Sequence, residues 1–380
     1  MATAELLVDS EALEQLRPEW DRLAVECARP CSAPALLLAW WRHVAPAAAQ
    51  PRVVAVHEGG RLVGLAPFLV EPGRLGRSQA RFLGTPTMPQ RSCILASAGY
   101  EAAVCAAAAS ALGRSEPRPA VLILERIDAA ATWPATLAAS WPAPARARLI
   151  RGMRVPGRVL SMEAGSFEAW LDGRSRNFRR EVRRTAHRVA AAGGRIERAE
   201  DPAASARALD AFERLHGARW GDRSRLWRPE TMAMLREAAE ELVGPARMRL
   251  YTVTGPEGIV ATLILFAAGG EVTGWNGGWD PAWAAQRPST ALTHRAVADC
   301  FELGDRRLDW GENAPLAKLR LSDGDDPLAW ATVLPRDVSY PLVRAATVPA
   351  RFRGHVRMAV RRLPPPVHRA LRDAHRRLSR

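Results

Sequence analysis

The sequence has no run of apolar residues approaching the ~18–20 needed to span a membrane, so we expect no transmembrane helix. Its N-terminus carries Glu5 and Asp9 and lacks a basic segment followed by an apolar one, which predicts no secretion signal and a cytoplasmic protein. The five cysteines show neither a Cys-x-x-Cys pair nor a His/Cys ligand spacing. This pattern argues against disulfides and against a bound metal.

Lysine is nearly absent, because Lys318 is the only one in the chain and arginine supplies the rest of the positive charge. The net charge of +14 favours acidic partners: coenzyme phosphates, nucleic acid, anionic lipid or anionic polysaccharide. It does not choose among them. Lys318 is either a chance survival or a position that needs a compact ammonium group, since arginine is not its equivalent.

The chain has 380 residues, of which 48% are hydrophobic and 25% charged, as expected for a globular protein with two ordinary domains. The segment from Arg247 to Lys318 has the most regular pattern. Two β-rich runs around the turn at residues 255–258 predict a hairpin. A third strand, a helix from about Pro288 that stops at Gly304, and a fourth strand follow. The four expected strands are residues 247–254, 259–267, 271–276 and 307–310.

The start of the expected helix is the first candidate site. A helix N-terminus presents unpaired backbone N–H groups and about half a positive charge, which together attract an anion. Pro288 suits the first helical position because its φ is fixed, and Ser289 or Thr290 is expected to supply a capping hydroxyl.

The loop before this helix, Gln286-x-x-Ser289-x-Ala291, resembles the pyrophosphate loop of the GNAT acyltransferase superfamily, with serine in place of the central glycine. A wider frame runs from Asn276-x-x-Trp279-Asp280-Pro281 through Asp309-x-Gly311 to Lys318. It is more specifically similar to the cellulose-biosynthesis (CelD/BcsL-like) acetyltransferases, which are related to the Fem-type peptidoglycan aminoacyltransferases.

The resemblance implies an α+β fold of two tandem GNAT-like units with mixed central sheets flanked by helices. It also implies acetyl-CoA, or another acyl-CoA, as co-substrate, and no metal. The residues that it places against the coenzyme are Trp275, Asn276, Gln286, Arg287, Ser289, Thr290 and Ala291.

Acyl transfer from a thioester needs a positioned acceptor, a base and hydrogen-bond donors for the developing oxyanion. No covalent nucleophile is obligatory, and the Gly-x-Ser-x-Gly motif is absent. Asp309, beside the expected coenzyme, and Glu312 just beyond it could orient the acceptor or take its proton, and Asp309 could equally be a structural cap. Lys318 falls at the family's Tyr-Lys position, where Ala317 replaces the tyrosine. A lysine there would neutralise an acidic acceptor or polarise the carbonyl.

Two helices before the hairpin carry further candidates. Leu215-His216 with Arg219-Trp220 resembles the family's Leu-His-x-x-Arg-Trp, so His216 either faces the acceptor or is structural. Residues 175–192 form a helix with an apolar stripe on one side and arginines on the rest. Those arginines either contact phosphates or form a solvated face.

The N-terminal half repeats the same order in outline. A hairpin over residues 52–69, a helix at 102–112 and a strand at 120–124 parallel the elements of the second half, which predicts a repeat at domain scale. This copy lacks the phosphate-loop pattern, and we interpret it as a degenerate copy that shapes the acceptor cleft. The expected units are residues 1–160, 161–340 and a basic amphipathic helical tail at 341–380.

The sequence therefore predicts a monomeric enzyme that transfers an acetyl group to an amine or hydroxyl of a sugar in an envelope or exopolysaccharide precursor. The basic tail either packs on the catalytic unit or contacts anionic membrane at its inner face. Two alternatives stay open: Fem-like transfer from aminoacyl-tRNA, which is the one role predicted for nucleic acid, and a non-catalytic GNAT-like scaffold.

Overall fold

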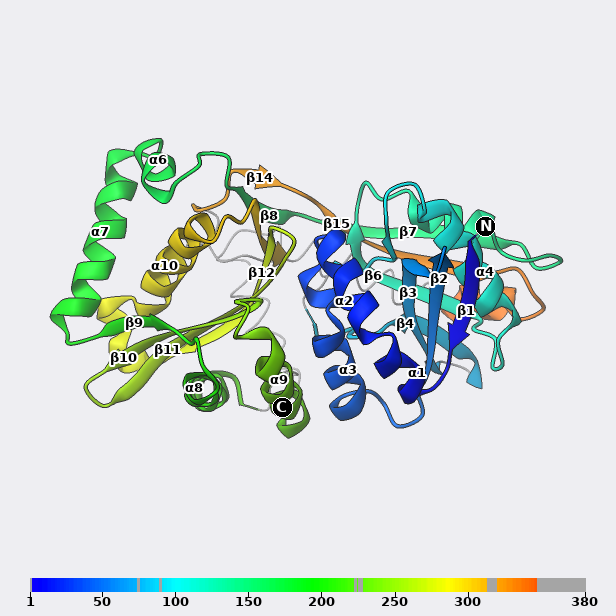
Figure 1. Ribbon diagram of the computed structural model, residues 1–380, viewed down its shortest axis with the longest axis horizontal. Helices are drawn as coiled ribbons and strands as arrows, with labels where there is room; N and C mark the ends of the chain where they lie inside the picture. The colour runs from blue at the N-terminus through cyan, green and yellow to red at the C-terminus, as the bar shows by residue number, and fades with distance from the viewer. Residues whose placement is uncertain are drawn as a thin grey trace, which may run out of the picture.

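Two mixed sheets, each flanked by helices, form two lobes joined across a broad helical contact (Figure 1). The computed structural model describes residues 2–73, 76–88, 91–221, 224, 228–312 and 320–346. The predicted α+β class is confirmed. Within these residues, no helix combines the length and apolar character needed to cross a bilayer.

The first sheet has the strand order β1-β2-β3-β4-β6-β15-β7, and β5 pairs with β3. Antiparallel pairing dominates, and the exception is the parallel pair β4–β6. The elements of this lobe are β1 (Thr3–Leu7), α1 (Ser10–Gln15), α2 (Arg17–Glu26), η1 (Pro30–Ser32), α3 (Pro34–His43), β2 (Gln50–Glu58), β3 (Arg61–Pro72), β4 (Ser78–Phe82), β5 (Leu95–Ala96), α4 (Glu101–Arg114), β6 (Val121–Asp128), α5 (Trp133–Ala139), β7 (Ala147–Val155) and β15 (Leu328–Pro335).

The second sheet has the order β14-β8-β13-β12-β11-β10-β9, with one parallel pair, β12–β13. Its elements are β8 (Gly157–Ser161), α6 (Phe167–Asp172), α7 (Arg176–Ala191), β9 (Arg195–Arg198), α8 (Pro202–Trp220), α9 (Pro229–Leu242), β10 (Met248–Gly255), β11 (Gly258–Ala268), β12 (Glu271–Trp279), η4 (Pro281–Gln286), α10 (Pro288–Glu302), β13 (Arg307–Glu312) and β14 (Gly324–Asp325).

The two lobes repeat one element order. A strand, a helical segment, three antiparallel strands, a helix and a parallel strand occur as β1 to β6 and again as β9 to β13. The helical segment is α1, α2, η1 and α3 in the first lobe and α8 and α9 in the second; the first lobe also has the short strand β5, and the second has η4. The parallel pairing of the last strand with the third strand of the meander is the same in both. This agreement supports the predicted repeat at domain scale.

Helices cover both faces of each sheet, and the middle layer is shared. In the first lobe α4 and α5 pack on one face, and in the second lobe α6, α7 and α10 do the same. The inner faces are covered by α2 and α3 from one side and by α8 and α9 from the other, and their apolar side chains form a single core across the contact. In Figure 1, α3 and α9 lie side by side at this contact.

The strand Leu328–Pro335, which the sequence placed in the 161–340 unit, lies in the first sheet between β6 and β7. The chain passes from the first sheet to the second at Pro156, between β7 and β8, and returns through β15. Tail residues 347–380 lie outside the described residues, so the predicted tail helices are not described.

Candidate functional site

The parallel strands β12 and β13 separate part-way along their length. They pair only at Glu271–Arg307, Val272–Leu308 and Thr273–Asp309. Beyond this point β12 continues beside β11, where Trp275 is an extra residue opposite the Ile264–Leu265 step, and β13 continues beside β8. A bulge bends a strand and disrupts its ladder. The strands therefore diverge directly after Thr273 and Asp309.

The loop from β12 to α10 leads from this divergence to the start of α10. Asp280 caps the short helix η4 by accepting from the Ala282 N–H at 2.9 Å. Arg287 then adopts a left-handed conformation (φ 55°, ψ 51°) as the N-cap of α10, and Pro288 occupies the first turn as predicted. The predicted capping hydroxyl is wrong, because no side chain caps this helix. The N–H groups of Thr290 and Ala291 donate to the Arg287 carbonyl at 3.0 and 3.2 Å, and Pro288 has no N–H. In the first turn, the N–H of Ser289 is therefore the group that can be offered to an anion.

The side chain of Arg287 is turned away from the loop toward α7. It donates to Glu181 at 2.8 Å, and Arg320 contacts the other oxygen of the same carboxylate. Burial raises the pKa of Glu181, but hydrogen bonds from the two guanidinium groups outweigh that effect and hold the pKa below its ordinary value. This predicted coenzyme residue therefore fastens the loop to α7.

The other predicted coenzyme residues lie along the loop and the end of β12. Ser289 is exposed, Thr290 is half-buried and Ala291 is buried. Gln286 has a buried Oε1 atom with no hydrogen-bond partner among the described residues. A buried amide oxygen without a partner is costly, so it marks a place where a ligand donor would fit.

Trp275 and Asn276, at the end of β12, make contacts away from the loop before α10. The Trp275 ring packs beside Phe212 and Phe266, at 5.9 and 6.0 Å between ring centroids, and so faces α8. Asn276 Oδ1 accepts from the N–H of Gly277 at 2.8 Å. These contacts place Trp275 on the face of the sheet opposite α10, whereas the loop residues lie at the end of α10.

His216 lies on α8 beside the end of β12. It is 4% exposed, its Nε2 lies 2.7 Å from Ser224 Oγ, and its ring centroid lies 5.2 Å from that of Phe212. Burial, followed by the nearby charge of Arg219, lowers the pKa of His216, so the neutral ring is favoured. Its buried Nδ1 has no partner among the described residues. The structure thus leaves one ring nitrogen open for a further hydrogen bond.

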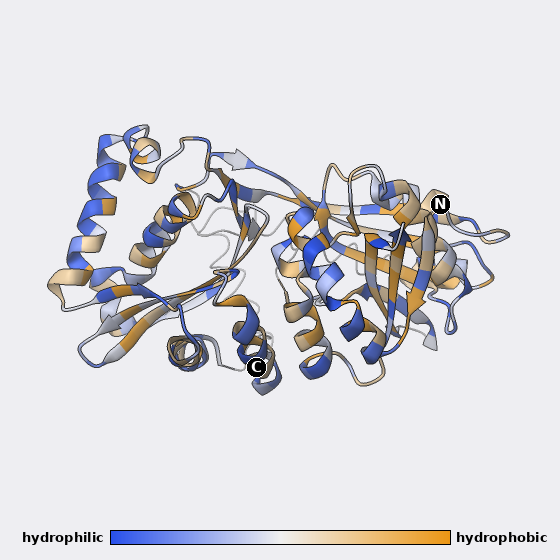
Figure 2. Cartoon of the chain, viewed as in Figure 1, coloured by the Kyte–Doolittle hydropathy of each residue, from blue (hydrophilic) through white to orange (hydrophobic). Residues whose placement is uncertain are grey.

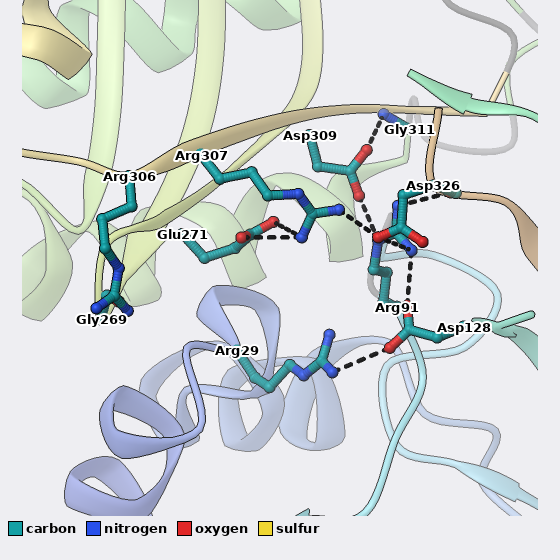
Figure 3. A network of polar contacts seen from close by, with 10 residues as sticks. All are labelled: Arg29, Arg91, Asp128, Gly269, Glu271, Arg306, Arg307, Asp309, Gly311 and Asp326. Carbon is teal, nitrogen blue, oxygen red and sulfur yellow. Dashed lines mark hydrogen bonds and ion pairs between the residues drawn. The ribbon is translucent and has the colours of Figure 1, made fainter. Parts of the chain in front are cut away.

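Asp309 lies at the contact between the lobes and is 2% exposed (Figure 3). Its Oδ2 accepts from Arg91 Nε at 2.6 Å, and its Oδ1 accepts from the N–H of Gly311 at 2.7 Å. Arg91 also donates to Asp128 at 2.6 Å and to the Asp326 carbonyl at 3.0 Å. The carboxylate is therefore held on both oxygens.

Arg91 comes from the first lobe, from the connection between β4 and α4. The corresponding connection in the second lobe is the loop between β12 and α10. The degenerate copy of that loop thus supplies a cation to the divergence point of the second sheet. Sequence reasoning missed Arg91, because nothing local distinguishes it among so many arginines.

Glu271 is a second residue that sequence reasoning missed. Burial raises its pKa to about 7, although Arg307 contacts both carboxylate oxygens, at 2.9 and 3.0 Å, and acts in the opposite direction. The negative charge of Asp309 adds to the rise. Glu271, Arg307 and Asp309 all face the first lobe in Figure 3. Glu271 directly follows a Gly-Gly turn, a position at which the sequence pattern indicates solvent exposure.

Glu312 is more open than Asp309. Its side chain is 25% exposed and lies 3.3 Å from Arg126 Nε, whereas that of Asp309 is 3% exposed. Gly311 has a φ of 72°, and this turn of the backbone separates the two carboxylates. Lys318 and Ala317 lie outside the described residues. Asp309 and Glu312 therefore share the end of β13, while His216 lies on α8 and the coenzyme loop lies at α10.

Groups that could hold a metal ion are not found among the described residues. The cysteines are free, and all except the half-buried Cys27 are buried. Burial raises the pKa of each of these thiols. Raised pKa values disfavour the thiolate, so none of them has the character of an activated nucleophile.

In a comparison with known families, residues 176–319 match the family described as Acetyltransferase (GNAT) domain. This stretch runs from the start of α7 past β13 and so contains the divergent strand pair, the loop and α10. No curated protein matches the chain.

Solved structures share the whole two-lobed fold at low identity. FemX aligns with a TM-score of 0.60 and 11% identity over 90% of this chain and 99% of its own. The C-terminal domain of a putative lysylphosphatidylglycerol synthetase from Agrobacterium fabrum aligns with a TM-score of 0.53 and 12% identity, over 88% of this chain and 96% of its own. A conserved protein of unknown function from Bacteroides thetaiotaomicron aligns with a TM-score of 0.56 and 10% identity, over 87% of this chain and 100% of its own. At these identities the similarity concerns the fold.

The family match includes the strand divergence and the start of α10, whereas Arg91 lies outside it. The narrower similarity to the CelD/BcsL-like acetyltransferases stays a prediction. Residues 176–319 thus match the acetyltransferase domain of the GNAT type, and this match supports an acyltransferase enzyme.

Proposed function

We propose that this enzyme transfers an acetyl group from acetyl-CoA to an amine or hydroxyl of a sugar in an envelope or exopolysaccharide precursor. The observation that carries the proposal is the start of α10, which lacks a side-chain cap, next to the diverging strands β12 and β13. Acyl-CoA would supply an activated thioester there. The sugar acceptor is favoured by the sequence resemblance to cellulose-biosynthesis acetyltransferases.

The coenzyme phosphates fit the first turn of α10. Ser289 is exposed at this turn, and backbone N–H groups at a helix start attract negative charge. The buried Oε1 of Gln286, which lacks a partner among the described residues, would accept from an N–H or O–H group elsewhere on the coenzyme, since phosphate oxygens only accept. Arg287 is assigned a positioning role, since its guanidinium ties the loop to Glu181 on α7.

The acceptor proton is better assigned to Glu312 than to Asp309. A general base must come within hydrogen-bond reach of the acceptor. Asp309 is enclosed and both of its oxygens already accept hydrogen bonds, whereas Glu312 is partly exposed at the end of the same strand. We therefore assign Glu312 as base and Asp309 as the group that fixes the end of β13. His216 would donate or accept one hydrogen bond at the acceptor.

Calorimetric titration with acetyl-CoA tests the coenzyme site, using Ser289→Glu beside Ser289→Gln. Both variants add a side chain of similar size at an exposed position, and only the first adds a negative charge. We expect Ser289→Glu to weaken binding by at least about tenfold relative to Ser289→Gln, since like charges repel at short range. Equal binding by the two variants would remove the phosphates from this turn while leaving the enzyme assignment intact.

The acceptor is tested by release of free CoA with amino sugars, neutral sugars and their polymers as separate substrates. We expect Glu312→Gln to lower kcat by about 10²–10⁴-fold with the best acceptor, the range typical of general base catalysis. Activity that needs aminoacyl-tRNA in place of acyl-CoA would favour the Fem-like alternative, for which the shared fold with FemX is the supporting observation. Binding of neither donor would favour the scaffold alternative.

Lys318 is proposed to polarise the acyl carbonyl or to neutralise an acidic acceptor. The tail from residue 341 is proposed to contact anionic membrane, which would keep a cytoplasmic enzyme near lipid-linked precursors.

A further inference from the structure

The outward face of α7 carries a concentrated positive charge that the transfer reaction does not use. Arg176, Arg179, Arg180, Arg183, Arg184 and His187 line a shallow hollow of about 560 Å³ on this helix. All of them except the half-buried Arg179 are exposed. In Figures 1 and 2, α7 lies at one end of the long axis of the molecule and is mostly hydrophilic.

The arginines lie opposite the side by which α7 is held. Phe178, Val182 and Val189 are buried in the core under α7, against α10. Arg176, Arg180, Arg183 and His187 follow each other at steps of four, three and four residues, so they form one line along the opposite side. This line can contact a flat surface over the whole length of the helix.

No acidic residue of α7 itself balances this charge. Glu181 is the only acid in the helix, and it faces inward to Arg287 and Arg320. Packing the five arginine charges along this side of one helix costs stability through repulsion. An anionic partner that lies against the face would relieve that repulsion.

We propose that this face of α7 docks the enzyme on anionic phospholipid membrane, with the arginines binding headgroup phosphates. Arginine binds phosphate through two parallel hydrogen bonds, and the hollow between the side chains is open enough for headgroups. The docking does not depend on the identity of the acceptor.

The chemistry of the face favours a membrane over nucleic acid. Proteins that bind single strands stack successive bases on several aromatic side chains, whereas His187 is the one aromatic ring exposed on α7. The other exposed residues of the helix besides arginine are Asn177 and alanines such as Ala186 and Ala190. The groove of an A-form RNA duplex that a helix would have to enter is deep and narrow. Because the apolar side of α7 is buried, the helix binds without insertion into the bilayer. Salt therefore releases it.

The test is co-sedimentation of the full-length chain with phosphatidylcholine vesicles, with and without about 30% phosphatidylglycerol. The α7 variant carries Arg176→Gln, Arg180→Gln, Arg183→Gln and Arg184→Gln. Glutamine and arginine have similar helix propensities, so the helix is expected to persist, and circular dichroism checks this. A control variant removes the same charge at four other exposed sites, through Arg114→Gln, Arg146→Gln, Arg207→Gln and Arg228→Gln.

We expect binding to the anionic vesicles alone, reversed at about 0.5 M salt. Each arginine near an anionic surface contributes about fivefold, so the α7 variant should lose at least about 30-fold in partition while the control variant loses much less. An equal loss in both variants would reduce the effect to net charge and overturn the proposal. Undiminished binding by the α7 variant would assign the contact to another part of the chain and also overturn it.

A gel-shift assay with transfer RNA is run on the same proteins. RNA binding that depends on α7, together with vesicle binding that does not, would replace the membrane by RNA as the partner. Titration with acetyl-CoA separates this proposal from the proposed function, because both four-site variants are expected to bind the coenzyme as the unaltered protein does.

Discussion

At the scale of single residues, Arg91 joins the two lobes through Asp309. Both side chains are almost fully enclosed, at 6% exposure for Arg91 and 3% for Asp309, and Arg91 Nε lies 2.6 Å from Asp309 Oδ2. Removing one member of a buried pair leaves the other as an uncompensated buried charge. Asp128, Asp309 and the Asp326 carbonyl would all lose a donor with Arg91.

We therefore predict that Arg91→Gln lowers the free energy of unfolding by about 3–5 kcal/mol in urea titrations. Arg61→Gln is the matched control, because Arg61 is 60% exposed and pairs with Glu26 at the surface. That change should cost at most about 1 kcal/mol. Equal losses for the two variants would contradict the role given to Arg91.

Glu271 predicts a dependence of stability on pH. Its pKa is raised from 4.5 to about 7 by burial, so the folded protein binds this proton more tightly than the unfolded chain. The stabilisation is fully present below pH 4.5 and is lost as pH rises through about 7. Relative to Glu271→Gln, the native protein should lose up to about 3 kcal/mol between pH 4.5 and 8, measured by urea unfolding at several pH values. A constant difference across this range would show that the carboxyl titrates normally.

At the scale of elements, local pattern predicted most of what folds locally. The hairpin, the third strand and the helix after Pro288 occur as β10, β11, β12 and α10, because period and turn residues act over short distances. The cap of α10 was predicted wrongly, since Arg287 takes a left-handed conformation that its sequence does not announce. Arg91 and Asp309 are 218 residues apart, and no periodicity reports such a contact.

Glycine at the end of β12 makes the approach of α8 possible. A Cβ atom at Gly278 would lie 2.8 Å from Leu215 Cβ and 3.1 Å from the backbone nitrogen of His216. Real Cβ atoms do not sit so close, so a side chain there would push α8 and its histidine away from the sheet. The sequence showed two glycines at this place without indicating which element approached them.

Gly278→Ala is therefore predicted to cost about 1–3 kcal/mol of stability, as overpacking does, and to raise KM for the acceptor if His216 contacts it. Gly244→Ala serves as control, because a Cβ atom there would have no neighbour within 4 Å. Urea unfolding and steady-state kinetics on both variants give the comparison. An acceptor KM that stays unchanged while stability falls would confine His216 to a structural role.

At the scale of the whole molecule, the lobes are tied by both chain path and packing. The last strand of the second half returns to the first sheet, where β15 separates β7 from β6. Without β15, residues 1–155 would leave β7 unpaired. The domain boundaries expected from the sequence treat the halves as consecutive, and this crossing was not visible because the pattern of a strand does not say which sheet it joins.

The shared core makes a calorimetric prediction about cooperativity. Apolar side chains of α2 and α3 and of α8 and α9 form one cluster, so the melting of either lobe would expose part of the core of the other. We expect a single transition, and three Leu or Val truncations probe its extent: Leu137→Ala in the first-lobe core, Val297→Ala in the second-lobe core and Leu235→Ala in the shared core. Each truncation removes buried volume and lowers the free energy of unfolding, by about 2–5 kcal/mol for a leucine and less for valine.

If the molecule unfolds as one unit, all three truncations lower the same Tm. Two transitions, one moved by Leu137→Ala and the other by Val297→Ala, would mean that the lobes fold independently, and Arg91 would then reach Asp309 only when both are already formed.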